Sequence, residues 1–263
     1  MPASSLPPRR RRPEAAAGKT SGSRAGDLVR ALFGGVISCL APPRCRCCRA
    51  PLLDHANPFL CADCAAGVGW IGAGACRGCG FPAGPHAELG GDCSHCRGKN
   101  LGFTAAAAVA RYRRGARKLV LALKFGGETE IARPMAGLMA ERLRSAGFGD
   151  IDWIVPASLH PARRRLRGFD QSRLLAAHLS RETGIPLRWD LLRRIRPTRP
   201  QSTLSRAARF ENAQGAFAAS PEIAGGRALL VDDVMTTGAT LRDSARACRQ
   251  AGASRVYALV FAR

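Results

Sequence analysis

The chain has 263 residues and a formal net charge of +22, which arises from 41 lysines and arginines against 19 aspartates and glutamates. Such a balance favours polyanionic partners, either phosphorylated small molecules or nucleic acid. No apolar run approaches the roughly 20 residues that a membrane-spanning helix needs, and no export signal is evident. We therefore expect a cytoplasmic protein without a membrane span.

The N-terminal part of the chain consists of two different segments. Residues 1–26 are rich in Pro, Arg, Ala, Ser and Gly and contain almost no large apolar residues, a composition that predicts a disordered basic tail. The stretch from Leu28 to Leu40 is apolar but is interrupted by Arg30 and Gly34-Gly35, and it predicts a short amphipathic helix.

Eight of the eleven cysteines form four C-x-x-C pairs, separated by spacers of 12, 11 and 13 residues. Each pair can hold one side of a zinc ion, and two pairs complete the closed four-cysteine site of a structural zinc. Disulfides are the alternative, but thiols stay reduced in a protein that is not exported. The predicted ligands of about two zinc ions are Cys45, Cys48, Cys61, Cys64, Cys76, Cys79, Cys93 and Cys96.

Spacer length alone does not decide which cysteine pairs belong together. Gly80 suits the first knuckle of a ribbon, and residues 65–75 have the composition of a Gly/Ala linker. We therefore expect the first pair to join the second and the third to join the fourth, in two tandem zinc ribbons. Cys39 and Cys47 remain outside these pairs, although Cys47 competes with Cys48 as a ligand, and Cys248 is expected in the core of a helix.

From Leu101 onward, short apolar runs alternate with helical patterns, which predicts a mostly parallel sheet with helices on both faces. In such sheets, ligands bind beyond the carboxyl ends of the strands. The predicted strands are 105–112, 151–156, 227–232 and 255–261, and the predicted helices are 115–125, 131–145, 171–183 and 239–252.

The most informative segment runs from Val231 to Thr240, after the apolar run Ala228-Leu229-Leu230. It places two carboxylates, Asp232 and Asp233, at the end of a buried strand, with a Thr/Gly-rich turn before a helix. Free N–H groups at a helix N-terminus favour a phosphate, and threonine hydroxyls can donate to the same oxygens. Acidic residues beside a phosphate indicate a ligand that also carries ribose hydroxyls and a divalent metal. A purely structural strand–turn–helix is the alternative.

These ten residues resemble the 5-phosphoribosyl-1-pyrophosphate (PRPP) loop of type I phosphoribosyltransferases. Three further stretches are 154–160, 167–172 (Arg-Gly-Phe-Asp-Gln-Ser) and 201–217, and with the upstream C-x-x-C pairs they resemble the ComF/GntX family over about residues 40 to 263. That family usually has a second Pro where this chain has Ala157-Ser158, and Asn where it has Asp170. With the composition of the N-terminal segments, this resemblance gives three predicted parts: a disordered basic tail at 1–26, a short helix plus double zinc ribbon at 27–100, and a phosphoribosyltransferase-like domain at 101–263.

By this resemblance, Asp232 and Asp233 are catalytic residues that contact the ribose hydroxyls of PRPP and help to order Mg²⁺. Residues 236–240 hold the 5-phosphate, and the arginine run 163–167 neutralises the leaving pyrophosphate, unless it is a solvated surface. The set implied for PRPP binding is Val231, Asp232, Asp233, Val234, Met235, Thr236, Thr237, Gly238, Ala239, Thr240, Arg167 and Lys124.

The resemblance implies a Mg²⁺-dependent phosphoribosyltransferase, or a protein that binds PRPP or a related phosphoribosyl nucleotide. The acceptor and the oligomeric state stay open. A second hypothesis is a non-enzymatic protein of DNA uptake, with single-stranded DNA or competence proteins as partners. Against it, aromatic residues make up only 6% of the chain and are not interleaved with basic residues. A third hypothesis makes the ribbons a protein-docking module.

Overall fold

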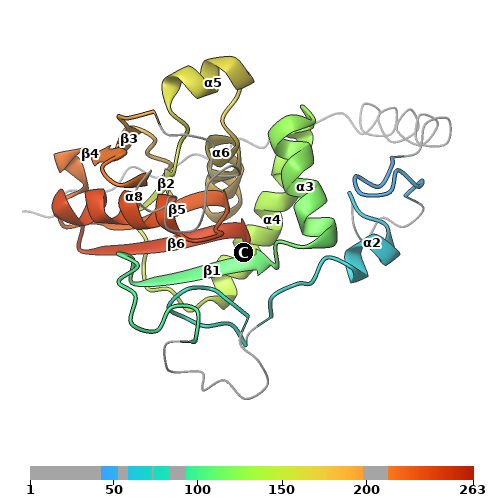
Figure 1. The fold of residues 1–263 in the computed structure, drawn as a ribbon, viewed down its shortest axis with the longest axis horizontal. Coiled ribbons are helices and arrows are strands. Elements are labelled where there is room, and N and C mark those ends of the chain that lie inside the picture. The colour runs from blue at the N-terminus through green and yellow to red at the C-terminus, as the bar shows by residue number, and fades with distance from the viewer. Residues whose placement is uncertain (1–42, 53–58, 73, 83–92, 198–212) are drawn as a thin grey trace, which may run out of the picture. The chain divides into compact units, whose positions relative to one another are not determined.

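The computed structural model describes residues 43–52, 59–72, 74–82, 93–197 and 213–263 (Figure 1). The predicted basic tail, the predicted helix at 28–40 and most of the family stretch 201–217 lie outside these described residues. The boundaries of the three predicted domains therefore stay a prediction.

In the described part of the chain, four parallel strands form the central sheet in the order β1-β6-β5-β2. The two central strands are buried over almost their whole length, which explains their continuous apolar sequences. Val231 lies between Pro156 and Leu259 in the register, so the residues that follow it reach the carboxyl edge of the sheet. The bounds are Ala105–Ala110 for β1, Trp153–Pro156 for β2, Arg227–Val234 for β5 and Arg255–Ala262 for β6.

Helices cover both faces of this sheet, as predicted (Figure 1). On one face, α3, α4 and α6 bury alternate strand residues such as Leu229 and Leu259, and on the other face α8 buries Leu230 and Val260. None of the described helices is long and apolar enough to cross a membrane. The helices of this domain are α3 (Arg114–Phe125), η1 (Thr129–Ile131), α4 (Ala132–Ser145), α5 (Pro161–Arg167), α6 (Gln171–Thr183), η3 (Pro221–Ile223) and α8 (Ala239–Gln250).

The short elements that were not predicted include α5 and the antiparallel pair β3 (Leu192–Arg194) and β4 (Phe217–Ala219). Helix α5 begins at a proline, and the Nδ1 atom of His160 accepts a hydrogen bond from the backbone N–H of Ala162 at 3.3 Å. It ends at Gly168, whose φ of 81° lies in the left-handed region. Three consecutive arginines hide this helix from a search for apolar periodicity.

The Gly/Ala-rich segment 65–75 joins the two cysteine groups, as predicted, but it also packs against the sheet. Helix α2 (Ala62–Ala66) overlaps its start, and Val68 is fully buried in the core cluster of the sheet. The backbone N–H of Ile71 donates to the carbonyl of Val109 at 2.8 Å, so this segment hydrogen-bonds to the edge strand β1. Val68, Trp70 and Ile71 lie among glycines and alanines without a helical or strand period, so the sequence alone does not indicate what they pack against.

Candidate functional site

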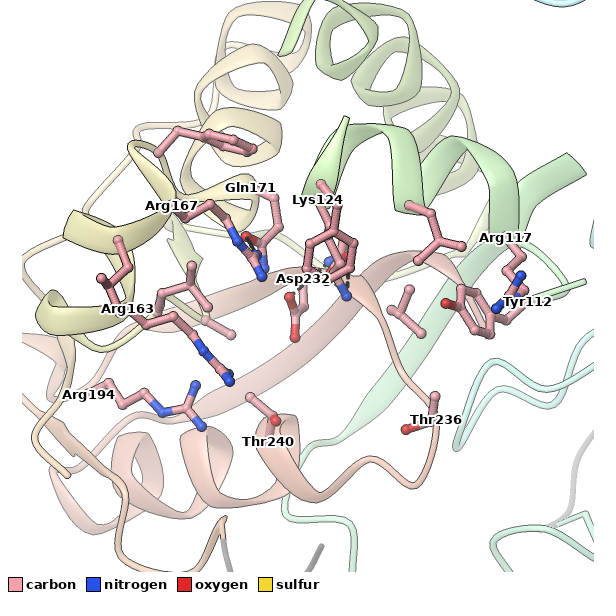
Figure 2. Close-up of a pocket in the computed structure, with 18 of the residues that line it drawn as sticks. Tyr112, Arg117, Lys124, Arg163, Arg167, Gln171, Arg194, Asp232, Thr236 and Thr240 are labelled. Atoms are coloured by element: carbon pink, nitrogen blue, oxygen red, sulfur yellow. Dashed lines mark hydrogen bonds and ion pairs between the residues drawn. The ribbon is translucent and has the colours of Figure 1, made fainter. Parts of the chain in front are cut away.

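A pocket of about 960 Å³ opens at the carboxyl ends of the strands, where a sheet of this kind binds its ligands. Helices α3 and α5 supply two of its walls, and the end of β5 with the loop into α8 supplies another (Figure 2). Its polar lining residues are Tyr112, Arg117, Lys124, Arg163, Arg167, Gln171, Arg194, Asp232, Asp233, Thr236 and Thr240. The pocket therefore brings together both predicted carboxylates and several of the predicted cations.

The two carboxylates at the end of β5 are buried, with exposed fractions of 8% for Asp232 and 2% for Asp233. The Oδ1 atom of Asp232 accepts hydrogen bonds from the hydroxyl of Ser172 at 2.7 Å and from the backbone N–H of Asp233 at 2.9 Å. Burial, and then the neighbouring charge of Asp233, raise the pKa of Asp232 above its ordinary range. This pair is therefore poised to gain from a cation or from hydroxyl donors.

Lys124, at the end of α3, forms an ion pair with one of these carboxylates. Its Nζ atom lies 2.7 Å from Oδ2 of Asp233. Burial acts to lower the pKa of Lys124, but the charges of Asp233 and Asp232 outweigh it and raise the pKa. Lys124, which is predicted to bind pyrophosphate, is thus also the counter-ion of Asp233, which is predicted to contact the ribose.

The loop after β5 turns at a glycine directly before α8. Gly238 has a φ of 82°, a value that residues other than glycine rarely adopt, and α8 begins directly after it. Thr236 and Thr240 line the pocket. The first N–H groups of a helix point out of its N-terminal end, an arrangement that suits an anion.

Not every residue of the predicted PRPP set turns its side chain to the pocket. Val231 is fully buried in the core of the sheet, and Met235 is 2% exposed. The backbone N–H of Met235 donates to the carbonyl of Ala262 at 2.9 Å. These two residues fix the loop to the sheet, while Thr237 is absent from the described lining.

The arginines around the pocket include two that the sequence did not indicate, Arg117 of α3 and Arg194. Arg163 and Arg167 of α5 line the pocket, whereas Arg164 and Arg165 do not. Arg194 comes from β3, far from every motif, and lies with Arg163 on the same side of the pocket (Figure 2). Burial lowers the pKa of Arg194, and the charge of Asp232 opposes this shift. No local signal marks Arg194, since its role depends on the fold.

The β3–β4 pair that carries Arg194 is held by a buried acid of α8. Asp243 is 5% exposed, and its carboxylate accepts the backbone N–H groups of Gly215, Ala216 and Phe217 at 2.9, 2.8 and 3.1 Å. It also forms an ion pair with Arg246 at 2.8 Å. This clamp was not predicted, because mid-helix acids give no signal of what they bond.

Both positions that depart from the family pattern are hydrogen-bonded into the structure. Asp170 caps α6 by accepting the N–H groups of Ser172 and Arg173, and its other oxygen accepts that of Leu159 at 2.7 Å. Burial raises the pKa of Asp170, although the hydrogen bonds from these N–H groups act to lower it. The hydroxyl of Ser158 accepts from Nε of Arg173 at 3.1 Å. Asp170 thus joins α6 to the loop beyond β2.

The cysteines gather in two groups of four, Cys45, Cys48, Cys61 and Cys64 in one and Cys76, Cys79, Cys93 and Cys96 in the other. Within each group, the Sγ atoms lie within 4.8 Å of one another, and all described cysteines are free thiols. This is the predicted pairing, and the donor sets fit two structural zinc ions. The Sγ atom of Cys47 points elsewhere, 3.6 Å from the carbonyl of Gly115.

The first cysteine group contacts the segment that follows the helix of Lys124. Arg46 and Arg49 form ion pairs with Glu128, just after that helix, at 3.3 and 2.7 Å. Arg46 also pairs with Glu130 at 3.2 Å. The ribbon module thus reaches the loop at the edge of the pocket, where Gly127 is a lining residue.

Comparisons with known proteins agree with this architecture. A family model described as a phosphoribosyl transferase domain matches residues 170–263. DNA utilization protein YhgH of Salmonella typhi is 34% identical over 220 residues, covering 82% of this chain and 94% of the relative. Competence protein F of Haemophilus influenzae is 28% identical and covers 78% and 97%. Competence protein ComFC of Streptococcus pneumoniae is 27% identical and covers 78% and 88%.

The similarity to these relatives extends over most of the chain, and not over an isolated motif. A parallel sheet with helices on both faces, two groups of four cysteines and a carboxylate–threonine loop at the strand ends are the features that the sequence motifs implied. The chain therefore belongs to the ComF family of phosphoribosyltransferase-like proteins.

Proposed function

We propose that this protein binds PRPP together with Mg²⁺ in the pocket and acts as a phosphoribosyltransferase. The observation that carries the proposal is the buried pair Asp232 and Asp233, which lines one pocket together with the threonines of the following loop and a set of cations. A ligand that matches this order of charges carries a phosphate, ribose hydroxyls and a pyrophosphate.

In this proposal, each part of the pocket recognises one part of PRPP. Thr236, Thr240 and the N-terminus of α8 bind the 5-phosphate, and Asp232 and Asp233 accept the ribose hydroxyls. Carboxylate oxygens are also the donors that Mg²⁺ prefers, and a bound Mg²⁺ would shield the charge of the pyrophosphate. The neighbouring cations Lys124, Arg163, Arg167 and Arg194 line the pocket for the leaving group.

The reaction would break the bond between the anomeric carbon and the pyrophosphate oxygen, whose electron pair leaves with pyrophosphate. The acceptor supplies the electron pair of the new bond to that carbon. Positive charge develops on the sugar, and the protein contributes placement and electrostatic stabilisation of the leaving group.

The deciding experiment is calorimetric titration of Mg²⁺–PRPP into the full chain and into a variant with both Asp232→Asn and Asp233→Asn. Losing charge-assisted hydrogen bonds of roughly 1.5–3 kcal/mol each should weaken binding at least tenfold. The fold should lose no more than about 1 kcal/mol, because relief of the carboxylate repulsion offsets the lost partner of Lys124.

The matched control removes two exposed carboxylates instead, Asp150→Asn with Glu222→Gln, whose side chains are 86% and 66% exposed. It should leave PRPP affinity unchanged. A destabilised Asp232/Asp233 variant with wild-type affinity would refute the site, and a wild-type protein that binds no PRPP would refute the function.

A second candidate function, binding of single-stranded DNA, is favoured by a feature that the sequence did not reveal. Trp189 is 53% exposed with the guanidinium of Arg173 at 5.7 Å from its ring, and Phe125 is 72% exposed with Arg167 at 5.0 Å. The fold thus does place exposed aromatic rings beside arginines, as stacking surfaces for bases do. The names of the relatives, DNA utilization and competence proteins, agree with such a role.

For this candidate, we expect weak, sequence-independent DNA binding that collapses at moderate salt, since each neutralised phosphate adds close to one unit of log–log slope. Trp189→Ala should weaken binding about fivefold or more, because stacking contributes roughly 1–3 kcal/mol per base. Trp70→Ala, at a tryptophan that is 40% exposed, is the control. Fluorescence anisotropy with a labelled oligonucleotide measures both. Tight binding that survives high salt would place DNA ahead of PRPP as the ligand.

A further inference from the structure

Arg263, which follows β6, hydrogen-bonds to the loop that we assign to the 5-phosphate. Its Nη1 atom donates to the carbonyl of Met235 at 3.1 Å and to that of Thr236 at 3.3 Å. Its backbone N–H donates to Ala110 at 2.9 Å, and its carbonyl accepts from Tyr112 at 2.6 Å. Both its backbone and its side chain are thus fixed between β1 and the loop.

The same side chain contacts the second cysteine group. The guanidinium carbon of Arg263 lies 5.6 Å from the centroid of the Phe81 ring, which is within the range of a cation–π contact. Phe81 follows Cys79 by two positions, in the knuckle of that group. Cys79 is fully buried, and its Sγ atom lies 3.5 Å from that of Cys93.

The knuckle that holds Cys79 is itself packed directly on β1. Gly80 has a φ of 67°, and a Cβ atom there would lie 3.2 Å from backbone atoms of Ala106 and Ala107. The backbone N–H of Ala106 donates to the carbonyl of Arg77 at 3.0 Å. The cysteine group, the edge strand and Arg263 therefore form one continuous set of contacts that ends at the loop.

We propose that Arg263 is a positioning residue through which the second four-cysteine site fixes the phosphate loop. In a trans peptide, the C=O and the following N–H point in opposite directions. Holding the carbonyls of Met235 and Thr236 on the arginine therefore turns the N–H groups of Thr236 and Thr237 away from it, toward the proposed phosphate. Metal binding at the second group orders the knuckle that carries Phe81, and it thereby fixes the ring against which the guanidinium of Arg263 lies.

The loop-ordering part of this inference is independent of PRPP, whereas its effect on affinity rests on the proposed function. The first test is hydrogen exchange of the 235–240 amides in the ligand-free, zinc-loaded full chain. Arg263→Met should speed exchange of these amides about tenfold while the protein keeps two zinc ions, and Arg263→Lys should restore part of the protection. The control is Arg249→Met, which removes an arginine bonded to Ser254 and Thr104, away from the loop.

Unchanged exchange in both Arg263 variants would overturn the inference. If Arg263→Met does not fold, the exchange of the same amides is measured in Arg263→Lys. This variant keeps the positive charge but lacks the planar guanidinium that donates to two carbonyls at once. Mg²⁺–PRPP affinity should fall about tenfold in Arg263→Met. Wild-type protein that binds no PRPP would remove the proposed function and leave the exchange result standing.

The two cysteine groups also differ in what they should control. Cys93→Ser in the second group and Cys48→Ser in the first each remove one predicted zinc ligand, but of the two groups only the second includes the knuckle whose Phe81 ring lies against Arg263. Cys93→Ser should therefore speed exchange of the 235–240 amides, and Cys48→Ser should leave them near wild type. Equal acceleration in both variants would contradict the assigned path.

Discussion

At the scale of single residues, the carboxylate pair of the pocket depends on a lysine that belongs to another element. Lys124 and Asp233 are 109 positions apart in the chain, yet their charged atoms are 2.7 Å apart. The side chain of Lys124 is 22% exposed and that of Asp233 is 3% exposed. Two adjacent buried carboxylates repel each other, and the ammonium of Lys124 offsets this repulsion when no ligand is bound.

Lys124→Met should therefore lower the free energy of unfolding by about 1–3 kcal/mol, because it leaves the buried acids without their cation. Adding Asp233→Asn to it should recover most of this loss, since the two residues act as a pair. Urea denaturation of the single and double variants measures the coupling. Lys118→Met, at an exposed lysine of the same helix, should change stability by less than about 0.5 kcal/mol. A double variant no better than Lys124→Met would show that the pair is not coupled.

At the scale of elements, the β3–β4 pair is attached to the sheet domain through α8. The carboxylate of Asp243 accepts three consecutive backbone N–H groups at the start of β4, and β3 is the strand that supplies Arg194 to the pocket. Short strands of three residues each cannot hold their own place without such an anchor. The position of Arg194 thus depends on a helix residue that is not part of the pocket lining.

Asp243→Ala should cost about 2–4 kcal/mol of stability, because it leaves three N–H groups of the β4 segment without their charged acceptor. It should also weaken binding of Mg²⁺–PRPP, because Arg194 is released. Glu141→Ala, at an exposed acid of α4, is the matched control and should change neither property. Thermal melts and calorimetric titration of the two variants give the comparison. Wild-type PRPP affinity in Asp243→Ala would show that the anchor does not position Arg194 for the ligand.

At the scale of the whole molecule, the cysteine-rich module and the sheet domain share one core. Pro43–Arg263 forms a single compact unit. Leu52, Leu60 and Val68 from the module lie in the same buried cluster as the strands and helices of one sheet face. Because the module has little apolar surface of its own, we expect metal binding to supply much of its folding free energy.

We predict about two zinc ions per chain by elemental analysis and a single unfolding transition of the zinc-loaded protein by calorimetry. Chelation should lower the melting temperature of the whole unit, because the ion pairs from Arg46 to Glu128 and the packing of Gly80 on β1 depend on ordered knuckles. Addition of Mg²⁺ after chelation controls for ionic strength and should not restore the melting temperature. A metal-free, fully folded module with disulfides would refute the zinc assignment.

The sequence by itself determined those features that depend on near neighbours in the chain. The cysteine spacings identified the two groups, and the alternation of apolar runs identified the parallel sheet and the faces of its helices. The strand–carboxylate–turn–helix order identified Asp232, Asp233 and the loop, because all of these lie within ten consecutive residues.

Tertiary structure alone decided which distant side chains complete the pocket. Ser172 reaches Asp232 across 60 positions of the chain, Arg194 comes from a three-residue strand, and Arg263 joins the loop to the knuckle of a cysteine group. None of these residues lies in a local sequence pattern, because the sequence around an arginine or serine does not distinguish a solvated surface from a pocket. Their roles follow from the order of strands in the sheet, which brings separate parts of the chain to one edge.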